Sequence, residues 1–395
     1  MLIGFVGKPS VGKSTFFKAA TLAEAEIAPY PFTTIKPNHG VGYIKIDCID
    51  KEFNAQCNPN HGFCINHKRF VPIDLMDVAG LVPGASEGKG LGNQFLDDLR
   101  QADVFVHIVD VSGTTDETGK PAEDYDVTKD VVFLEDELNK WYLGILMKVW
   151  KSFARKAELE GDNFARAVAT QFSGLKVNED HVKKVFSKLK FSHKPSTWTN
   201  EELLQFASEL RKETKPMIIA ANKVDTSHGK YNYEKLLKEF PDMKIIPCSA
   251  DSELALREAA KAGIIDYTPG EKEFSIKGNL NDRQKQALDK IKKEVLDDFE
   301  FGTGVQEILN YAVLNLLKYI AIFPAGAHKL ADSKGRVLPD CFLLPPNSTA
   351  LDFAFFLHTD FGNNFLRAID ARTKRVLGRD YALKHRDALE IVTSK

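Results

Sequence analysis

The feature that most constrains this chain is a short glycine-containing stretch close to its start. An apolar run at residues 2–6 (LIGFV) leads into GKPSVGKS at residues 7–14, and TFFKAA at residues 15–20 has the character of a helix. This order of strand, loop and helix fits G-x-x-x-x-G-K-[ST], the phosphate-binding P-loop. Glycines let such a loop curl until its backbone N–H groups converge on anionic oxygens at a helix N-terminus. A glycine turn that binds no ligand would require neither the Gly-Lys-Ser triplet nor the apolar strand before it. Because this sequence has both, we expect the loop to bind a nucleotide.

Within this loop Lys13 is expected to hold the β- and γ-phosphates, and Ser14 is expected to ligate Mg²⁺. The residues expected to contact the nucleotide here are Gly7, Lys8, Pro9, Ser10, Val11, Gly12, Lys13, Ser14 and Thr15.

The bulk properties of the chain narrow the remaining possibilities. Its 395 residues exceed one ordinary core and predict two or three domains. A formal net charge of -2 argues against holding nucleic acid by global charge, so any such contact would be local. The sequence shows neither a signal-peptide pattern nor a long apolar run, and its five cysteines do not suggest an extracellular disulfide framework. We therefore expect a cytoplasmic protein without a membrane partner, and we make no prediction of its oligomeric state.

A second motif, Asp77-Val78-Ala79-Gly80, directly follows an apolar strand predicted at residues 69–76. Asp-x-x-Gly is weak by itself, but roughly sixty residues past a P-loop and at a strand end it is a strong signal. In nucleotide hydrolases of this plan the Asp holds Mg²⁺ through water, and the Gly N–H meets the γ-phosphate and swings when that phosphate leaves. Upstream, three prolines exclude regular helix at residues 29–38 (PYPFTTIKPN) and suit a segment that moves. A threonine there would complete the Mg²⁺ shell in the triphosphate state, although a Thr-Thr pair in a loop is often inert.

The excursion between strands predicted at residues 40–47 and 69–76 contains four residues of zinc-ligand type, Cys57, His61, Cys64 and His67. The six residues between the two cysteines do not fit a standard zinc finger. A polar loop with incidental Cys and His is therefore the favoured interpretation, and a Zn²⁺ site is retained as the alternative.

A base-recognition motif is predicted further along the chain. The apolar strand at residues 217–221 runs into Asn222-Lys223-Val224-Asp225, the guanine-specificity signature. The Asp225 carboxylate can accept hydrogen bonds from N1 and the 2-amino group of guanine, whereas adenine leaves it unpaired. A further strand at residues 244–247 ends at Cys248-Ser249-Ala250, where the Ala250 N–H is expected to meet guanine O6. We therefore expect Asn222, Lys223, Asp225, Ser249 and Ala250 to form the base side of the site.

These elements define a predicted α/β fold, a P-loop NTPase (Ras-like) G domain formed by residues 1–110 and 216–318. Between its two parts, apolar positions at helical spacing predict an inserted helical domain at residues 111–215 that is structural or docks a partner. From residue 319 to 395, short apolar runs and proline-rich connections predict a small α+β domain. Its last stretch, residues 361–395, carries eight Lys and Arg against four acids, which fits either a solvated face or an RNA-facing surface.

The assembled motifs resemble those of the Obg superfamily of translation-factor-class GTPases, closest to the archaeal and eukaryotic branch of the YchF group. Residues 30–38 (YPFTTIKPN) match switch I of that family, and residues 77–85 (DVAGLVPGA) with GKGLG at 88–92 match switch II. The C-terminal part resembles a TGS domain, a ubiquitin-like module of ribosome- and RNA-associated proteins. The resemblance implies that Thr34 senses Mg²⁺, so that Ser14, Thr34 and Asp77 are the metal residues and Lys13, Thr34 and Gly80 the catalytic ones.

Two positions separate this chain from related GTPases. Better-known YchF proteins have a degenerate base motif and favour ATP, whereas Asn222-Lys223-x-Asp225 is intact here, which favours GTP. Potassium-activated relatives carry an Asn at the position of Ser10, which argues against potassium dependence.

Hydrolysis of the nucleotide also needs a group that positions the attacking water. Leu81 stands where many GTPases have a water-orienting glutamine, so slow hydrolysis stimulated by a partner is expected. The leading hypothesis is a GTP/GDP switch acting on ribosomes or RNA. The rivals are a YchF-like ATPase and a nucleotide-stabilised binding module with incidental hydrolysis.

Overall fold

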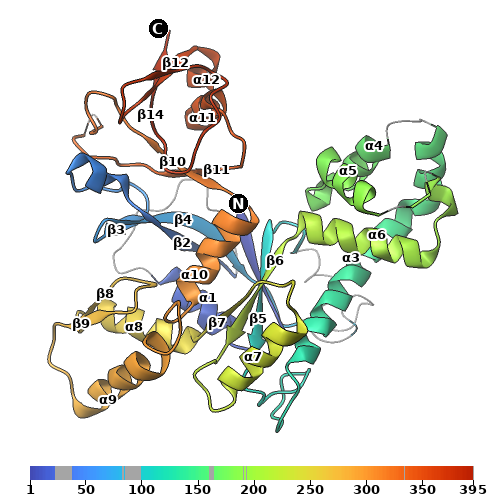
Figure 1. Ribbon diagram of the computed structural model, residues 1–395, viewed down its shortest axis with the longest axis horizontal. Helices are drawn as coiled ribbons and strands as arrows, with labels where there is room; N and C mark the ends of the chain where they lie inside the picture. Colours follow the sequence, from blue (N-terminus) through green and yellow to red (C-terminus); the bar gives the residue numbers. More distant parts are fainter. Residues whose placement is uncertain are drawn as a thin grey trace.

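The computed structural model describes residues 1–22, 38–81, 84, 99–159, 164–189, 191–192, 194–332 and 334–394. A seven-stranded sheet forms the centre of the molecule, with a second sheet domain and a helical segment projecting from it (Figure 1). The strands of the central sheet are β1 (Leu2–Val6), β2 (His39–Asp47), β3 (Phe63–Ile65), β4 (Lys68–Asp77), β5 (Val104–Asp110), β6 (Met217–Asn222) and β7 (Ile245–Cys248). They lie in the order β2-β4-β1-β5-β6-β7, and β3 pairs with β4.

The direction of the strands decides where a ligand can bind. Strands β4, β1, β5, β6 and β7 run parallel, and β2 pairs with β4 in the antiparallel direction. All five parallel strands therefore end at the same edge of the sheet, where ligands of open α/β sheets bind. The P-loop, Asp77 and Asn222 each follow or end one of these strands, so the fold brings together motifs far apart in the sequence.

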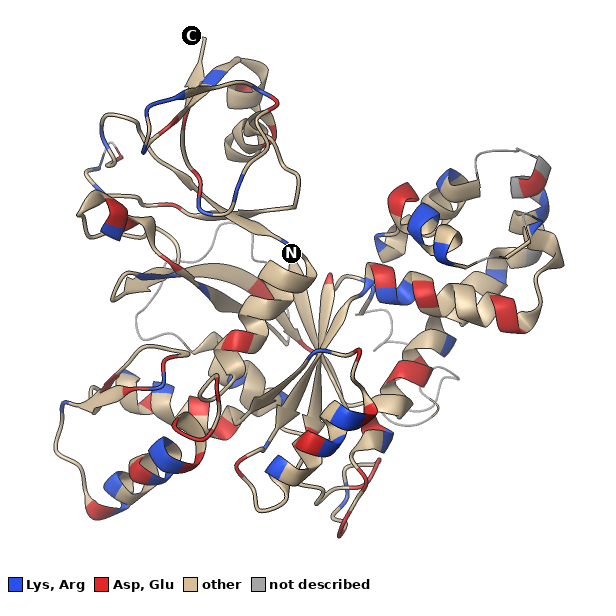
Figure 2. Ribbon diagram, in the orientation of Figure 1, with Lys and Arg blue, Asp and Glu red and all other residues tan. Residues whose placement is uncertain are grey.

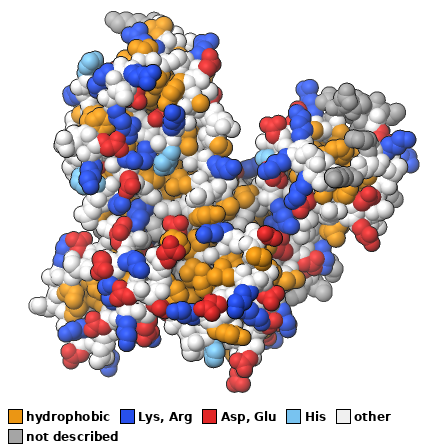
Figure 3. All heavy atoms as spheres, in the orientation of Figure 1, with side chains coloured by type: hydrophobic (Ala, Val, Ile, Leu, Met, Phe, Trp, Pro, Cys, Tyr) orange, Lys and Arg blue, Asp and Glu red, His pale blue; other side chains and the backbone are white. Residues whose placement is uncertain are grey.

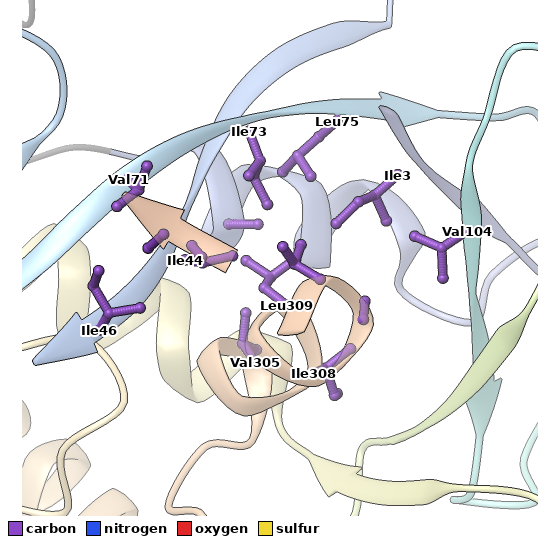
Figure 4. Packing of buried hydrophobic residues seen from close by; sticks show 14 of the residues in the cluster. Ile3, Ile44, Ile46, Val71, Ile73, Leu75, Val104, Val305, Ile308 and Leu309 are labelled. Atoms are coloured by element: carbon purple, nitrogen blue, oxygen red, sulfur yellow. The ribbon is translucent and has the colours of Figure 1, made fainter. Parts of the chain in front are cut away.

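Alternation along the strands builds two apolar layers. Ile3 and Phe5 face one cluster, which includes α1 (Lys13–Thr21) and α10 (Val305–Asn310), while Val6 faces a second cluster on the other side. Figure 4 shows Leu309 of α10 among side chains from the strands of the sheet. Every residue of β5 is buried, which fits a central parallel strand covered on both faces.

Helices fill the interval between β5 and β6. They are α3 (Thr128–Leu159), α4 (Phe164–Gln171), α5 (Glu179–Lys188) and α6 (Asn200–Thr214), with short 3₁₀ turns between them. A capping box opens α6: Thr199 Oγ1 accepts from Glu202 N, and Glu202 Oε2 accepts from Thr199 N. The Trp198 ring holds the layer together, with ring centroids 5.3 Å from Trp150 and 5.2 Å from Phe206.

The chain after β7 forms a small apolar cluster beside the sheet before it reaches the C-terminal domain. This cluster joins α8 (Ala250–Lys261), the hairpin of β8 (Ile265–Tyr267) and β9 (Phe274–Ile276), and α9 (Asp282–Ile291); α7 (Gly229–Glu239) precedes β7. The C-terminal domain contains β10 (Ile320–Pro324), β11 (Phe342–Leu344), α11 (Ala350–Leu357), α12 (Thr359–Asn363), β12 (Phe365–Asp370), β13 (Val376–Leu377) and β14 (Ala388–Thr393). Its sheet has the order β11-β10-β14-β12-β13 and packs α11 through Phe353 against Ile322 and Leu389.

The predicted fold class is confirmed: a P-loop α/β domain followed by a small α+β domain. Across the residues described above, no helix combines the length and apolar character needed to cross a bilayer.

Candidate nucleotide-binding site

A cavity of about 550 Å³ opens at the carboxyl ends of β1 and β4. It is lined by Ser10, Gly12, Lys13, Ser14, Thr15, Asn38, Asp77, Val78, Ala79 and Gly80. The parallel pairing of β1 with β4, in which Phe5 lies opposite Asp77, places the P-loop beside the Asp-x-x-Gly motif. Two predicted motifs separated by more than sixty residues thus form the walls of one cavity.

The P-loop is tied directly to the base motif. Gly12 has a left-handed φ of 93°, and a Cβ added to it would lie 2.5 Å from Asn222 Nδ2. That amide nitrogen donates to Val11 O at 2.9 Å. Glycine is therefore required at position 12 both for its backbone conformation and for the close approach of Asn222.

Lys13 forms part of the cavity wall and is 8% exposed. Its Nζ donates to Gly7 O at 3.0 Å and to Lys8 O at 2.6 Å. Burial lowers the pKa of Lys13 to about 8, although the nearby Asp77 carboxylate opposes the shift. A desolvated ammonium group is stabilised by an anion, so this lysine is suited to a phosphate.

Ser14 and Asp77 supply oxygen atoms next to Lys13. Ser14 Oγ donates to Asp77 Oδ2 at 2.9 Å, and Asp77 Oδ1 is buried with no hydrogen-bond partner among the described residues. Burial raises the pKa of Asp77, and the Ser14 hydrogen bond and the Lys13 charge oppose the shift. A hydroxyl and a carboxylate with a spare oxygen fit Mg²⁺, which takes hard oxygen ligands and keeps several waters. Thr34, the third predicted metal residue, lies outside the described residues.

The residues after Asp77 turn back against the P-loop. A Cβ on Gly80 would lie 2.9 Å from Pro9 N, and the N–H of Leu81 donates to Gly7 O at 3.0 Å. Leu81 is 1% exposed and packs in the apolar cluster that contains Val6. The side chain that follows Gly80 thus faces the core and does not line the cavity.

The base motif begins where β6 ends. Lys223 has a left-handed φ of 65° and its Nζ donates to Asp110 Oδ2 at 2.6 Å and to Ser10 O at 3.1 Å. Asp225 is half-buried, and none of the described residues donates a hydrogen bond to its carboxylate. This leaves the carboxylate free to accept from a base.

Ser249 and Ala250 are both buried next to Asn222. The Ser249 hydroxyl caps α8 by accepting from Ser252 N at 3.3 Å, and the Ala250 N–H donates to Asn222 Oδ1 at 3.0 Å. The N–H predicted to meet guanine O6 therefore orients Asn222 in this structure, and its role toward a base stays a prediction.

Lys8 was predicted to contact the nucleotide, but its side chain points away from the cavity. Its Nζ forms a buried ion pair with Asp130 at 2.8 Å, donates to Thr115 O at 2.8 Å and lies 4.1 Å from the centroid of the Tyr125 ring. Only the backbone of Lys8 is left for a phosphate. The side chain instead joins the P-loop to the start of α3.

Sequence reasoning missed two residues of the site. Asn38 lines the cavity and its carbonyl accepts from Asp77 N at 2.8 Å, while the buried Asp110 holds Lys223. Asp110 carries a signal that could have been used, because an acid that ends a fully apolar strand needs a partner. Asn38 carries no such signal, since its left-handed φ of 64° appears only in the structure.

The predicted zinc ligands separate into two groups, and only two of the four lie in a cluster that could hold a metal ion. The structure brings Cys57 and Cys64 together with Cys48 and Asp50, with the four ligand atoms within 4.8 Å of one another. His67 Nδ1 lies 3.0 Å from Asp50 Oδ1, outside the cluster, and His61 Nε2 lies against Asn60. Cys48 and Asp50 belong to the 3₁₀ turn at Ile49–Phe53, Cys48 as its N-cap, and this turn directly follows β2. Hydrogen bonding with Cys48 and Cys64 lowers the pKa of the Cys57 thiol to about 4.

Family comparisons agree with this geometry. The family model described as 50S ribosome-binding GTPase matches residues 2–140, and that of the Obg-like GTPase YGR210-like, G4 motif-containing domain matches residues 220–326. The TGS domain matches residues 330–393.

Individual relatives extend the match over the whole chain. A GTP-binding protein of Methanocaldococcus jannaschii is 48% identical and covers 100% of this chain and 99% of its own. The ribosome-binding ATPase YchF of Mycoplasma genitalium is 34% identical over 92% of this chain and 86% of its own. The solved structure of a GTP-binding protein from Pyrococcus horikoshii matches with a TM-score of 0.78 at 40% identity, covering 100% of both chains. The chain therefore belongs to the Obg-like P-loop GTPase family of the YchF type, which carries a C-terminal TGS domain.

Proposed function

We propose that this protein binds GTP with Mg²⁺ between the P-loop and residues 222–225, hydrolyses it slowly, and uses the nucleotide state as a switch on the ribosome or another RNA partner in the cytoplasm. One observation carries the guanine assignment. The amide of Asn222 is tied on one side to Val11 O and on the other to Ala250 N, so the base motif is held against the P-loop. The Asp225 carboxylate next to it has no donor among the described residues.

The chain's own residues divide the chemistry of binding. Lys13 supplies positive charge for the β- and γ-phosphates, and the backbone of the P-loop supplies N–H donors. Ser14 and Asp77 would hold Mg²⁺, with Thr34 joining in the triphosphate state. The metal's contribution is to neutralise charge on the phosphates. Gly80 would place its N–H near the γ-phosphate and respond when that phosphate leaves.

Slow turnover follows from the burial of Leu81. At 1% exposure this side chain lies in the core, and leucine has no group that can orient water. Positioning and charge stabilisation supply most of the catalysis in phosphoryl transfer. We therefore expect hydrolysis to accelerate when a partner supplies the missing positioning group.

We further propose that the chain is divided into three domains. A G domain from residues 1–110 and 216–318 would be interrupted by a helical domain at 111–215 and followed by a TGS domain at 319–395. The separate family matches at 2–140, 220–326 and 330–393 support this division. Figure 3 shows a wide gap between the C-terminal domain and the helical segment, and a large partner would contact both of its sides.

The ribosome or RNA assignment is supported by the surface of the C-terminal domain. The helices α11 and α12 carry no Lys or Arg, and the basic residues lie on strands and loops (Figure 2). Phe355, Phe356 and Phe361 are 45%, 50% and 43% exposed. Exposed aromatic rings and basic side chains on one domain suit stacking on unpaired bases and contacts with phosphates. The relative from Mycoplasma genitalium carries a ribosome-binding name.

The basic stretch of residues 361–395 is not wholly available for such a partner. Arg372 and Arg386 pair with Glu52, and Lys374 donates to Ala327 O and Ala371 O. An RNA surface would therefore be narrower than the sequence suggests.

A competition experiment tests the base assignment. We expect GTP to bind about 100-fold or more tightly than ATP, because adenine would leave the Asp225 carboxylate unpaired. Asp225→Asn should lower affinity for GTP and remove most of the preference, whereas Asp251→Asn, on the nearby helix α8, should leave both unchanged. Equal affinity for ATP and GTP in the wild type would instead support the second candidate, an ATPase, as the name of the Mycoplasma relative suggests.

A sedimentation experiment tests the switch. Ribosomes are pelleted with protein loaded with a non-hydrolysable GTP analogue or with GDP, and we expect more protein in the pellet with the analogue. Equal pelleting in both states would contradict the switch and favour a nucleotide-stabilised binding module.

A further inference from the structure

The thiol cluster at the β2–β4 hairpin has the spacing of a metal site. The Sγ atoms of Cys48 and Cys57 are 3.6 Å apart, and Cys64 Sγ lies 3.9 Å from Asp50 Oδ2. A tetrahedral Zn²⁺ with Zn–S bonds of about 2.3 Å separates two of its sulfur ligands by about 3.8 Å. A disulfide would bring the sulfurs to about 2.05 Å. The cysteines are free, and their separation is that of ligands arranged around a shared ion.

The chemistry of the cluster selects the kind of ion. Three sulfurs and one carboxylate oxygen form a soft donor set, which suits Zn²⁺ and does not suit Mg²⁺ or Ca²⁺. Asp50 is fully buried, and a buried carboxylate beside buried thiols is costly unless a positive charge accompanies it. A divalent cation would supply that charge.

Outer contacts already hold the carboxylate in place. Cys57 N donates to Asp50 Oδ2 at 3.1 Å, and His67 Nδ1 lies 3.0 Å from Asp50 Oδ1. Carboxylate and histidine pairs of this kind orient metal ligands from the second layer of contacts. His67 thus acts on Asp50 and leaves the four ligand positions to the cluster itself.

The hairpin that carries the cluster receives a loop of the C-terminal domain, residues 337–339, which follows β10. Asn58 N donates to Val337 O at 2.8 Å, and Asn60 N donates to Pro339 O at 2.7 Å. Arg69, 1% exposed, donates to Leu338 O at 3.1 Å and Pro339 O at 2.8 Å. These hydrogen bonds join residues 337–339 of the C-terminal domain to the hairpin and to β4.

Little regular structure holds the hairpin in that shape. Between β2 and β4 the chain forms a 3₁₀ turn at Ile49–Phe53 and the three-residue strand β3. A loop of this length with so few backbone hydrogen bonds of its own needs another constraint to hold the amides of Asn58 and Asn60 opposite their acceptors in residues 337–339. A metal ion that links both ends of the loop would provide it.

We propose that Cys48, Asp50, Cys57 and Cys64 bind one Zn²⁺ ion, and that this ion fixes the hairpin in the shape that receives residues 337–339. The site is structural, since all four ligand positions are occupied by protein atoms and none remains for a substrate. It is separate from the Mg²⁺ site at the P-loop and does not depend on the identity of the nucleotide.

Metal analysis of untagged protein from zinc-supplemented cultures tests the site. We expect about one Zn²⁺ per chain in the wild type and a loss of most of it in Cys57→Ala. Cys341→Ala is the matched control, because Cys341 is a buried cysteine of the same apolar core that lies outside the ligand set. This control should keep its zinc.

A second measurement does not depend on a folded variant. Titration of the wild-type thiols with a mercurial should release one Zn²⁺ to a colorimetric chelator, and Co²⁺ in place of zinc should give the charge-transfer absorption of thiolate ligands. Wild-type protein without zinc, or with a disulfide between Cys48 and Cys57 when freshly purified under non-oxidising conditions, would overturn the proposal. Equal zinc loss in Cys57→Ala and Cys341→Ala would overturn the ligand set.

Hydrogen exchange tests the effect on docking. The amides of Asn58 and Asn60 should exchange about tenfold or more slowly in zinc-loaded than in zinc-stripped protein, because their acceptors lie in residues 337–339. Amides of α6, far from the hairpin, should not change. Unchanged exchange at Asn58 and Asn60 would refute the docking role even if zinc binds.

Discussion

The cavity at the P-loop and the thiol cluster at the β2–β4 hairpin both gather metal-binding groups, but they differ in donor atoms and in access to solvent. The cavity of about 550 Å³ offers oxygens from Ser14 and Asp77 and has room for a nucleotide. The cluster holds its four ligand atoms within 4.8 Å of one another, with Cys48, Asp50 and Cys57 buried. Hard oxygen ligands in an open site suit Mg²⁺, which keeps water and leaves with its ligand. Buried thiols suit a metal that stays bound.

Donor chemistry and access to solvent together distinguish a site that exchanges its ligand from a site that holds a structural metal. In the cavity, Asp77 Oδ1 has no hydrogen-bond partner within the described part of the chain, and Lys13 is desolvated. In the cluster, the carboxylate of Asp50 already has contacts to Cys57 N and His67. Perturbing one site should therefore leave the other almost unchanged.

Lys13→Ala should give the largest effect. Removing a buried charged partner of an anion costs about 2–5 kcal/mol, and we expect GDP and GTP affinity to fall about 100-fold or more. The zinc content should stay at its wild-type value, since Lys13 belongs to the cavity alone. Calorimetric titration with nucleotide and metal analysis of the same preparation measure both.

Lys18→Ala serves as the control for that change. Lys18 is an exposed residue of the same helix, so its loss should alter nucleotide affinity little. A Lys13→Ala protein that binds nucleotide as well as Lys18→Ala would show that the cavity is not the phosphate site.

Asp77→Asn should give a smaller and more selective effect. If Asp77 holds Mg²⁺ through water, its replacement should raise the Mg²⁺ concentration needed for nucleotide binding about 10- to 100-fold. The variant without nucleotide should be as stable as the wild type or more so, because the substitution removes a buried carboxylate of which one oxygen has no partner among the residues that the structure describes. Thermal unfolding and Mg²⁺ titrations measure the two effects, and unchanged Mg²⁺ dependence would contradict the assigned role of Asp77.

Most of the fold followed from local patterns in the sequence. Strands that end in P-loop, Asp-x-x-Gly and Asn-Lys-x-Asp motifs predicted a parallel sheet, and apolar positions at helical spacing predicted the helices between β5 and β6. The cavity followed for the same reason, because parallel strands end at one edge. The direction of a side chain could not be predicted in the same way: the structure pairs the Lys8 side chain with Asp130, and the predicted contact of Lys8 with the nucleotide stays a prediction for its backbone.

The thiol cluster shows a second limit of sequence reasoning. Spacing along the chain suggested Cys57, His61, Cys64 and His67, but the ligand atoms that meet come from Cys48 and Asp50 as well. Cys48 stands at the end of β2, and the antiparallel pairing of Asp47 with Lys68 sets its distance from the loop. Such a contact arises from strand register and a turn, and neither is visible in the spacing of Cys and His.

A pH series should give the smallest effect and the sharpest contrast between the two sites. The pKa of Lys13 is lowered by burial to about 8, and the folded protein without nucleotide therefore loses this proton at a lower pH than the unfolded chain. Between pH 8 and 10.5, the folded state binds fewer protons than the unfolded one, so this group makes the nucleotide-free protein more stable as pH rises. Nucleotide affinity should move in the opposite direction and fall about tenfold from pH 7 to pH 9, because the phosphate requires the charged lysine.

At the thiol cluster, metal affinity should change with pH in the direction opposite to that of nucleotide affinity. Thiols must lose protons to bind metal, so zinc affinity should increase over the same range in which nucleotide affinity falls. Lys13→Ala separates the lysine from ionisation of the nucleotide, since its weaker affinity should vary less with pH than that of the wild type. Calorimetric titrations with GDP and zinc competition with a chelator in the same buffers measure both trends. If nucleotide affinity and zinc affinity both fell or both rose with pH, a common change in the fold would explain them, and the two sites would not be independent.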